Sequence, residues 1–87
     1  MVKKLEKTIT FHNKTDKNVQ VYIEPAAESF ILLSDKKAIF KIYYIEDIKT
    51  DPFDIEFDND SISVYEGQGM LLKIFIDEQL VYYTDYS

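Results

Sequence analysis

The chain has 87 residues, the length of a single domain spanning residues 1–87. Its 16 acidic residues against 10 lysines, with no arginine, give a net charge of −6. That balance disfavours binding to nucleic acids and to anionic membranes, both of which require clustered basic residues. The absence of cysteine excludes disulfides, thiolate nucleophiles and cysteine-based metal centres.

Alternation of apolar and polar residues dominates the chain. Seven tyrosines, six phenylalanines and many isoleucines fit a pleated, half-buried sheet better than a helix. In chain order, the alternation predicts about eight short strands at residues 5–12, 18–24, 29–33, 38–45, 53–58, 62–64, 70–76 and 79–83. Such strands are typical of a small antiparallel β-sandwich, with a small open β-barrel as the alternative.

Several of these strands have one clearly apolar face, which we expect to point into the core. The strongest case is the strand at 38–45, where every second residue from Ala38 to Tyr44 forms the more apolar face. Pro25 cannot donate to a sheet ladder, so it ends the second strand or marks an edge. Polar turns are expected at residues 13–17, 34–37, 58–60 and 77–78.

Acidic residues are concentrated between Glu46 and Asp60, where seven of fifteen residues carry a carboxylate. Asp54, Glu56 and Asp58 take every second position of one expected strand, so their side chains should project from one face, about 6–7 Å apart. Such a row is either a solvated outer face that protects a sheet edge or an anionic docking surface for a basic partner. The candidate partner-binding residues are Asp51, Asp54, Glu56, Asp58 and Asp60.

The same stretch offers a second hypothesis, a calcium site around Asp58-Asn59-Asp60. Calcium requires six to eight oxygen ligands. The EF-hand pattern fails here, because no glycine stands at its sixth place and no glutamate closes it at its twelfth. Only an irregular calcium site remains open, and no metal-binding residue is assigned.

Aromatic residues near the C-terminus form the third feature. Tyr82, Tyr83 and Tyr86 are candidate ligand-binding or interface residues, since exposed tyrosine is enriched at interfaces. The alternative is ordinary pairing of aromatic side chains across strands. His12 is the only histidine, and we expect it at the surface rather than in a catalytic or metal site.

Short motifs resemble a loose group of small uncharacterised bacterial β-domains. They are Asn13-x-Thr15, Val19-x-Val21-Tyr22-Ile23-Glu24-Pro25, Phe30-x-Leu32, Ile62-x-Val64-Tyr65 and the hairpin at Ile76-Asp77. The resemblance covers about half of the chain, and Glu78 stands where such hairpins commonly have glycine. It implies a bacterial β-sandwich and no activity, cofactor or site.

These observations favour a non-catalytic protein that docks a basic protein partner through its acidic face, as a bacterial immunity or inhibitor protein would. Two alternatives stay open: a carbohydrate- or calcium-binding sandwich module, and a structural domain that associates with itself. A Ser-His-Asp arrangement is formally available, but no serine lies in the glycine pattern of a nucleophile elbow, and we expect neither an enzyme activity nor a cofactor. Without a signal peptide or cysteines, we expect a cytoplasmic monomer or homodimer.

Overall fold

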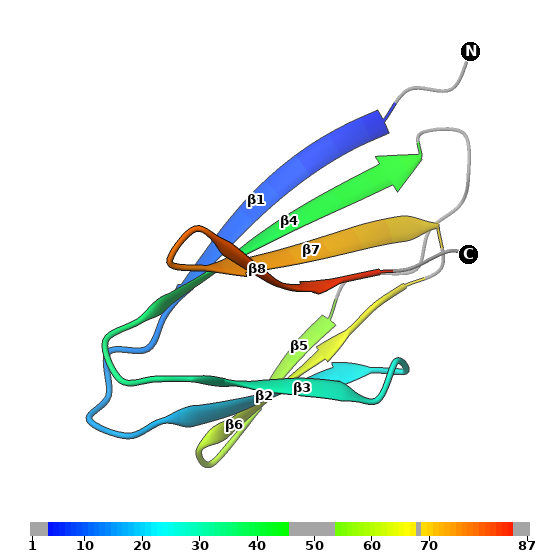
Figure 1. The fold of residues 1–87 in the computed structure, drawn as a ribbon. Helices are drawn as coiled ribbons and strands as arrows, with labels where there is room; N and C mark the ends of the chain where they lie inside the picture. The colour runs from blue at the N-terminus through cyan, green and yellow to red at the C-terminus, as the bar shows by residue number, and fades with distance from the viewer. Residues whose placement is uncertain (1–3, 46–53, 68, 85–87) are drawn as a thin grey trace.

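The computed structural model describes residues 4–45, 54–67 and 69–84, and this part of the chain folds into eight strands and no helix (Figure 1). The strands are β1 (Lys4–His12), β2 (Val19–Glu24), β3 (Glu28–Leu32), β4 (Lys37–Ile45), β5 (Asp54–Asp58), β6 (Ser61–Tyr65), β7 (Met70–Ile76) and β8 (Gln79–Tyr83). The all-β prediction is confirmed. None of the described residues belongs to a helix long and apolar enough to cross a membrane.

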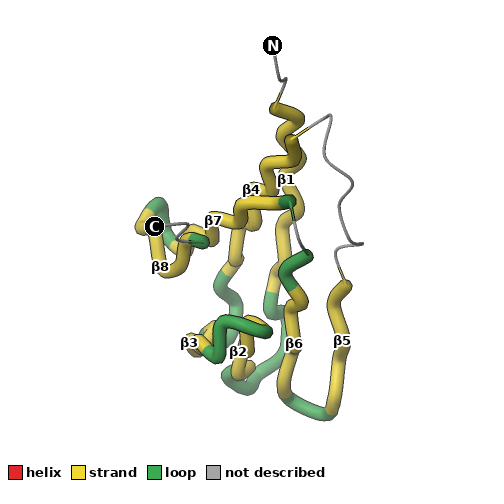
Figure 2. The backbone as a smooth tube through the Cα atoms, turned by 90° about the vertical axis from the view of Figure 1, so that its right-hand side faces the viewer, coloured by secondary structure: helices red, strands yellow, loops and turns green. Residues whose placement is uncertain are grey.

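The strands form two four-stranded sheets that face each other and do not close into a barrel (Figure 2). The first sheet has the order β1-β4-β7-β8, and the second has the order β3-β2-β6-β5. The fold is therefore a small β-sandwich, as the strand spacing predicts.

One strand pair differs from the antiparallel arrangement expected from the sequence. β2 and β6 run parallel, from Gln20 opposite Ser61 to Glu24 opposite Tyr65, whereas the other five pairs are antiparallel. Parallel neighbours require a long crossover connection. Here the chain leaves the second sheet after β3, builds β4 in the first sheet, and returns through β5 to place β6 beside β2.

The core lies between the sheets and consists of the apolar faces that the alternation predicts. Ala38, Phe40 and Ile42 of β4 are buried, and Tyr44 packs against them. The other buried apolar side chains are Val21, Ile23, Leu32, Ile62, Val64, Met70, Leu72 and Ile74. Because side chains alternate along a strand, burial of this set turns the residues between them outward.

The predicted tight turns are present with the backbone that they require. Asp77 and Glu78 both have positive φ, 51° and 65°, as in the two-residue turns whose twist matches a β-hairpin. Asp35 and Asn59 also have positive φ, in the turns predicted at 34–37 and 58–60, a conformation that Asp and Asn tolerate better than most residues. Polar residues thus make turns that glycine makes in many hairpins.

Candidate functional site

The acidic row lies on β5, an edge strand of the second sheet. Asp54, Glu56 and Asp58 are all exposed, while Ile55 between them packs against the core, so the three carboxylates project from the outer face. Asp60 is exposed in the turn that follows. Asp51, the fifth residue of the predicted set, lies outside the described residues.

The strand register shows which side chains share the outer face with this row. Tyr65 of β6 lies opposite Asp54, and Tyr22 of β2 lies opposite Ser63 of β6, which in turn lies opposite Glu56. The two tyrosines are 43% (Tyr22) and 37% (Tyr65) exposed. A hydrogen bond to Glu56 and the charge of that carboxylate raise the pKa of Tyr65. Acidic and aromatic groups therefore alternate across neighbouring strands.

We call this surface the acidic face; its residues are Gln20, Tyr22, Glu24, Ser29, Ile31, Asp54, Glu56, Asp58, Ser61, Ser63 and Tyr65. The four strands of the second sheet contain no lysine, whereas the strands of the first sheet contain Lys4, Lys7, Lys37, Lys41 and Lys73. Within the described residues, no lysine pairs with the row. Among the described residues, the carboxylates of the row therefore have no cationic partner, and Glu56 has only the neutral hydroxyl of Tyr65.

The calcium hypothesis gains no support from the described residues. No three acidic or histidine side chains among them converge as a metal site would require. Alternate residues of an extended strand point the same way without converging, which is why the row spreads its oxygens along an edge.

The C-terminal tyrosines do not form one cluster. The Tyr82 hydroxyl donates to Glu66 Oε1 at 2.7 Å, and the Thr84 hydroxyl donates to the same oxygen. Burial, followed by the interaction with Glu66, raises the pKa of Tyr82 well above its usual range. Tyr83 turns to the opposite side of β8 and is 55% exposed. Tyr86 lies outside the described residues.

Tyr82 therefore has a structural partner, which the sequence pattern did not reveal. Its bond to Glu66 ties the last strand of the first sheet to the segment that follows β6 of the second sheet. Tyr82 and Tyr83 also line a small pocket of about 360 Å³ together with Glu28, Leu80 and Val81. This pocket lies where the edges of β3 and β8 approach each other.

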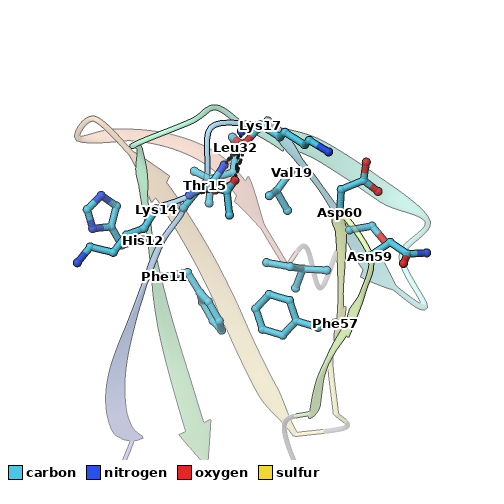
Figure 3. Close-up of a pocket in the computed structure, with 13 residues that line it drawn as sticks. Phe11, His12, Lys14, Thr15, Lys17, Val19, Leu32, Phe57, Asn59 and Asp60 are labelled. Atoms are coloured by element: carbon cyan, nitrogen blue, oxygen red, sulfur yellow. Dashed lines mark hydrogen bonds between the residues drawn. The ribbon is translucent and has the colours of Figure 1, made fainter.

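A larger pocket, of about 450 Å³, opens between the sheets at the end where β1 and β5 finish (Figure 3). Phe11 and Phe57 line it together as a tilted pair of rings with centroids 6.4 Å apart, and Phe11 also packs against the core ring of Phe40, with centroids 5.2 Å apart. Phe57 is 71% exposed, the largest exposed fraction among the large hydrophobic residues of the described chain. The pocket thus combines buried apolar side chains in its interior with an exposed aromatic ring at its opening.

The wall of this pocket is built around Asn13, the one buried polar residue in the described chain. Its Nδ2 donates to the carbonyls of Lys17 at 2.8 Å and Leu32 at 3.0 Å. Its Oδ1 accepts from the Thr15 amide at 3.1 Å and the Thr15 hydroxyl at 2.7 Å. Every polar atom of the side chain is used, so the loop between β1 and β2 is held in one shape.

The sequence held a signal for this wall in Asn13-x-Thr15, because asparagine and threonine two residues apart commonly bond the local backbone in turns. The sequence also places a glycosylation sequon here, but in this fold the Asn13 amide is buried and fully bonded, so a glycan on it would disrupt these hydrogen bonds. His12, beside it, is half-buried and lies 2.9 Å from Asp35 Oδ1, with no further acidic or nucleophilic partner among the described residues.

Comparisons with protein-family models, with curated proteins and with solved structures found no match.

Proposed function

We propose that the protein is a non-catalytic binding domain that docks a basic protein partner through the acidic face. The observation that carries the proposal is the sorting of charge between the sheets: acidic residues and exposed tyrosines share the outer face of a sheet that contains no lysine. Complementary charge steers a partner toward such a surface and fixes its register.

The exposed tyrosines add apolar contact area to the charge of the acidic face. Tyr22 and Tyr65 offer contact area of low conformational entropy, and aromatic residues dominate the energetics of many interfaces. A partner that matches this face presents lysine or arginine beside apolar groups. A small cytoplasmic inhibitor or immunity protein of a basic target would have this character, and we include that role and location in the proposal.

The test uses two variants with equal charge change as baits for capture from a lysate of the source organism. Asp54→Asn, Glu56→Gln and Asp58→Asn together neutralise the row. Its matched control neutralises three exposed carboxylates elsewhere, through Glu6→Gln, Asp16→Asn and Glu78→Gln.

We expect the unaltered protein and the control to retain the same basic protein at low salt and to release it at high salt. The row variant should not retain this protein at either salt concentration. Mass spectrometry names the captured protein, and calorimetry at two salt concentrations then gives its affinity. Equal capture by the row variant and the control would refute docking through this face.

A further inference from the structure

The pocket lined by Phe11 and Phe57 opens beside the turn that follows the acidic row and is distinct from the acidic face. We propose that it receives one aromatic or large aliphatic side chain from the basic partner. The identity of the partner rests on the proposed function, whereas the pocket's preference for an apolar group does not.

Among the described residues that line the pocket, the one polar side chain that is buried has no free atom for a polar ligand. Asn13 is the one buried polar lining residue, and both its amide hydrogens and its carbonyl oxygen are already bonded. Burying an unpaired polar group of a ligand there would cost free energy. Val19, Leu32 and Ile62 line the interior instead, which favours an apolar occupant.

The exposure of Phe57 gives a physical reason for an occupant. Phe57 lies on the inward-facing side of β5, yet β5 is an edge strand, and among the described residues Phe11 is the one aromatic ring that packs against it. A side chain inserted beside both rings would remove apolar surface from water, the main favourable term in association. Aromatic pairs add a further contribution when their edges and faces meet.

The position of the pocket points to a protein side chain rather than a free small molecule. Its rim includes Asn59 and Asp60, the turn that directly follows Asp58 of the acidic row. Figure 3 shows this turn on one side of the opening, His12 and Lys14 on the other side pointing away from the rings, and Lys17 across the top. A basic partner that lies on the acidic face therefore meets Asn59 and Asp60 at the rim, on the side away from His12 and Lys14.

This arrangement has the anatomy of an interface hot spot. One large side chain fills a dry pocket, and polar or charged contacts around it exclude water. The wall fixed by Asn13 keeps the pocket open before binding, which lowers the ordering cost of association.

The test begins with two neutral probes, N-acetyl-phenylalanine amide and N-acetyl-alanine amide, titrated into the ¹⁵N-labelled protein. We expect saturable shifts at the amides of the lining residues with the phenylalanine probe. The alanine probe should bind at least about tenfold more weakly, because it buries far less apolar surface. Identical, non-saturating shifts with both probes would overturn the proposal.

Three variants test whether the phenylalanine probe binds in this pocket. Phe57→Ala removes an exposed ring, so the fold should survive, and Val19→Phe fills the interior; both should abolish saturable binding of the phenylalanine probe. Leu80→Ala removes an exposed apolar side chain at the opposite edge of the sandwich and should leave binding unchanged. Binding by Phe57→Ala equal to that of the unaltered protein would also overturn the proposal.

A third probe separates this inference from the proposed function. It is a pentapeptide with phenylalanine between two pairs of lysines, compared with the same peptide carrying alanine at its centre. The row variant should bind the phenylalanine pentapeptide more weakly than the unaltered protein does, and it should bind the neutral phenylalanine probe equally well. If the row variant binds the pentapeptide normally while Phe57→Ala does not, the acidic-face proposal fails and the pocket stands. If the row controls binding but the central residue has no effect, the pocket proposal fails.

Discussion

The outer faces of the two sheets differ in whether their charged side chains have oppositely charged or aromatic partners within the fold. On the first sheet, Lys41 and Lys73 lie opposite each other, and each ammonium sits over a ring of its own face: Lys41 over Phe75 at 5.5 Å, and Lys73 over Tyr43 at 5.6 Å. The attraction between a cation and an aromatic face offsets part of the repulsion between the lysines.

The acidic face has no cation on its strands. Among the described residues, the Lys36–Asp77 ion pair and the bond between His12 and Asp35 both lie away from the row. Glu56 is hydrogen-bonded by Tyr65, a neutral partner that leaves the charge of the carboxylate in place. On the first sheet, Lys41 and Lys73 therefore find partners within the fold, whereas the second sheet leaves the net negative charge of the row to solvent or to a partner.

The largest expected effect concerns Asn13, because the contrast depends on the two sheets keeping one arrangement. Asn13→Ala leaves the carbonyls of Lys17 and Leu32 without their donor, and we expect a loss of about 2–4 kcal/mol in the free energy of unfolding. Denaturant unfolding measures it. Asn18→Ala, in the same loop with one exposed bond to Ser34, is the control and should lose less. Equal losses would show that Asn13 does not organise the loop.

The next largest effect concerns the hydrogen bond between Tyr82 and Glu66, which links the two sheets. Tyr82→Phe removes the hydroxyl that donates to Glu66 and should cost about 1–2 kcal/mol at neutral pH. Tyr83→Phe, which alters an exposed tyrosine on the same strand, should cost close to nothing. A similar cost for both variants would argue against the link.

The link should also weaken in alkali. The pKa of Tyr82 is raised in the folded protein, so its contribution is complete below the unfolded tyrosine pKa of about 10 and falls as the pH rises above that value. The stability difference between the unaltered protein and Tyr82→Phe should therefore shrink above about pH 10. Thermal unfolding at a series of pH values measures it, and a constant difference would contradict the assignment.

A smaller effect is expected for the lysines of the first sheet. Lys41→Gln or Lys73→Gln should each cost up to about 1 kcal/mol, because each loses one cation–aromatic contact. Lys14→Gln alters an exposed loop lysine and serves as the control. Denaturant midpoints compare the three variants, and a gain in stability from removing either strand lysine would mean that repulsion outweighs the aromatic contacts.

The smallest effect on stability is expected for the row itself. Neutralising Asp54, Glu56 and Asp58 together should leave the free energy of unfolding unchanged or raise it by about 0.5 kcal/mol, because exposed charges contribute little and these three repel one another. A loss of more than about 1 kcal/mol would show that the row supports the fold, and the contrast between the sheets would then need another explanation.

The sequence by itself determined the strands, most of the turns and the inward faces. Alternation is a local property, so Ala38, Phe40 and Ile42 could be placed in the core without knowledge of any partner strand. The tight turns at Asn59 and at Asp77-Glu78 likewise depend on neighbouring residues alone.

Tertiary structure alone decided how those strands combine. The parallel pairing of β2 with β6 joins segments about 40 residues apart, and no local pattern encodes which of several apolar strands will be neighbours. The same holds for three further features of the molecule. Residues from strands distant in sequence come together in the lysine-free face, in the Tyr82–Glu66 link and in the pocket at Phe57. These residues become neighbours because the apolar faces of the two sheets are buried against each other.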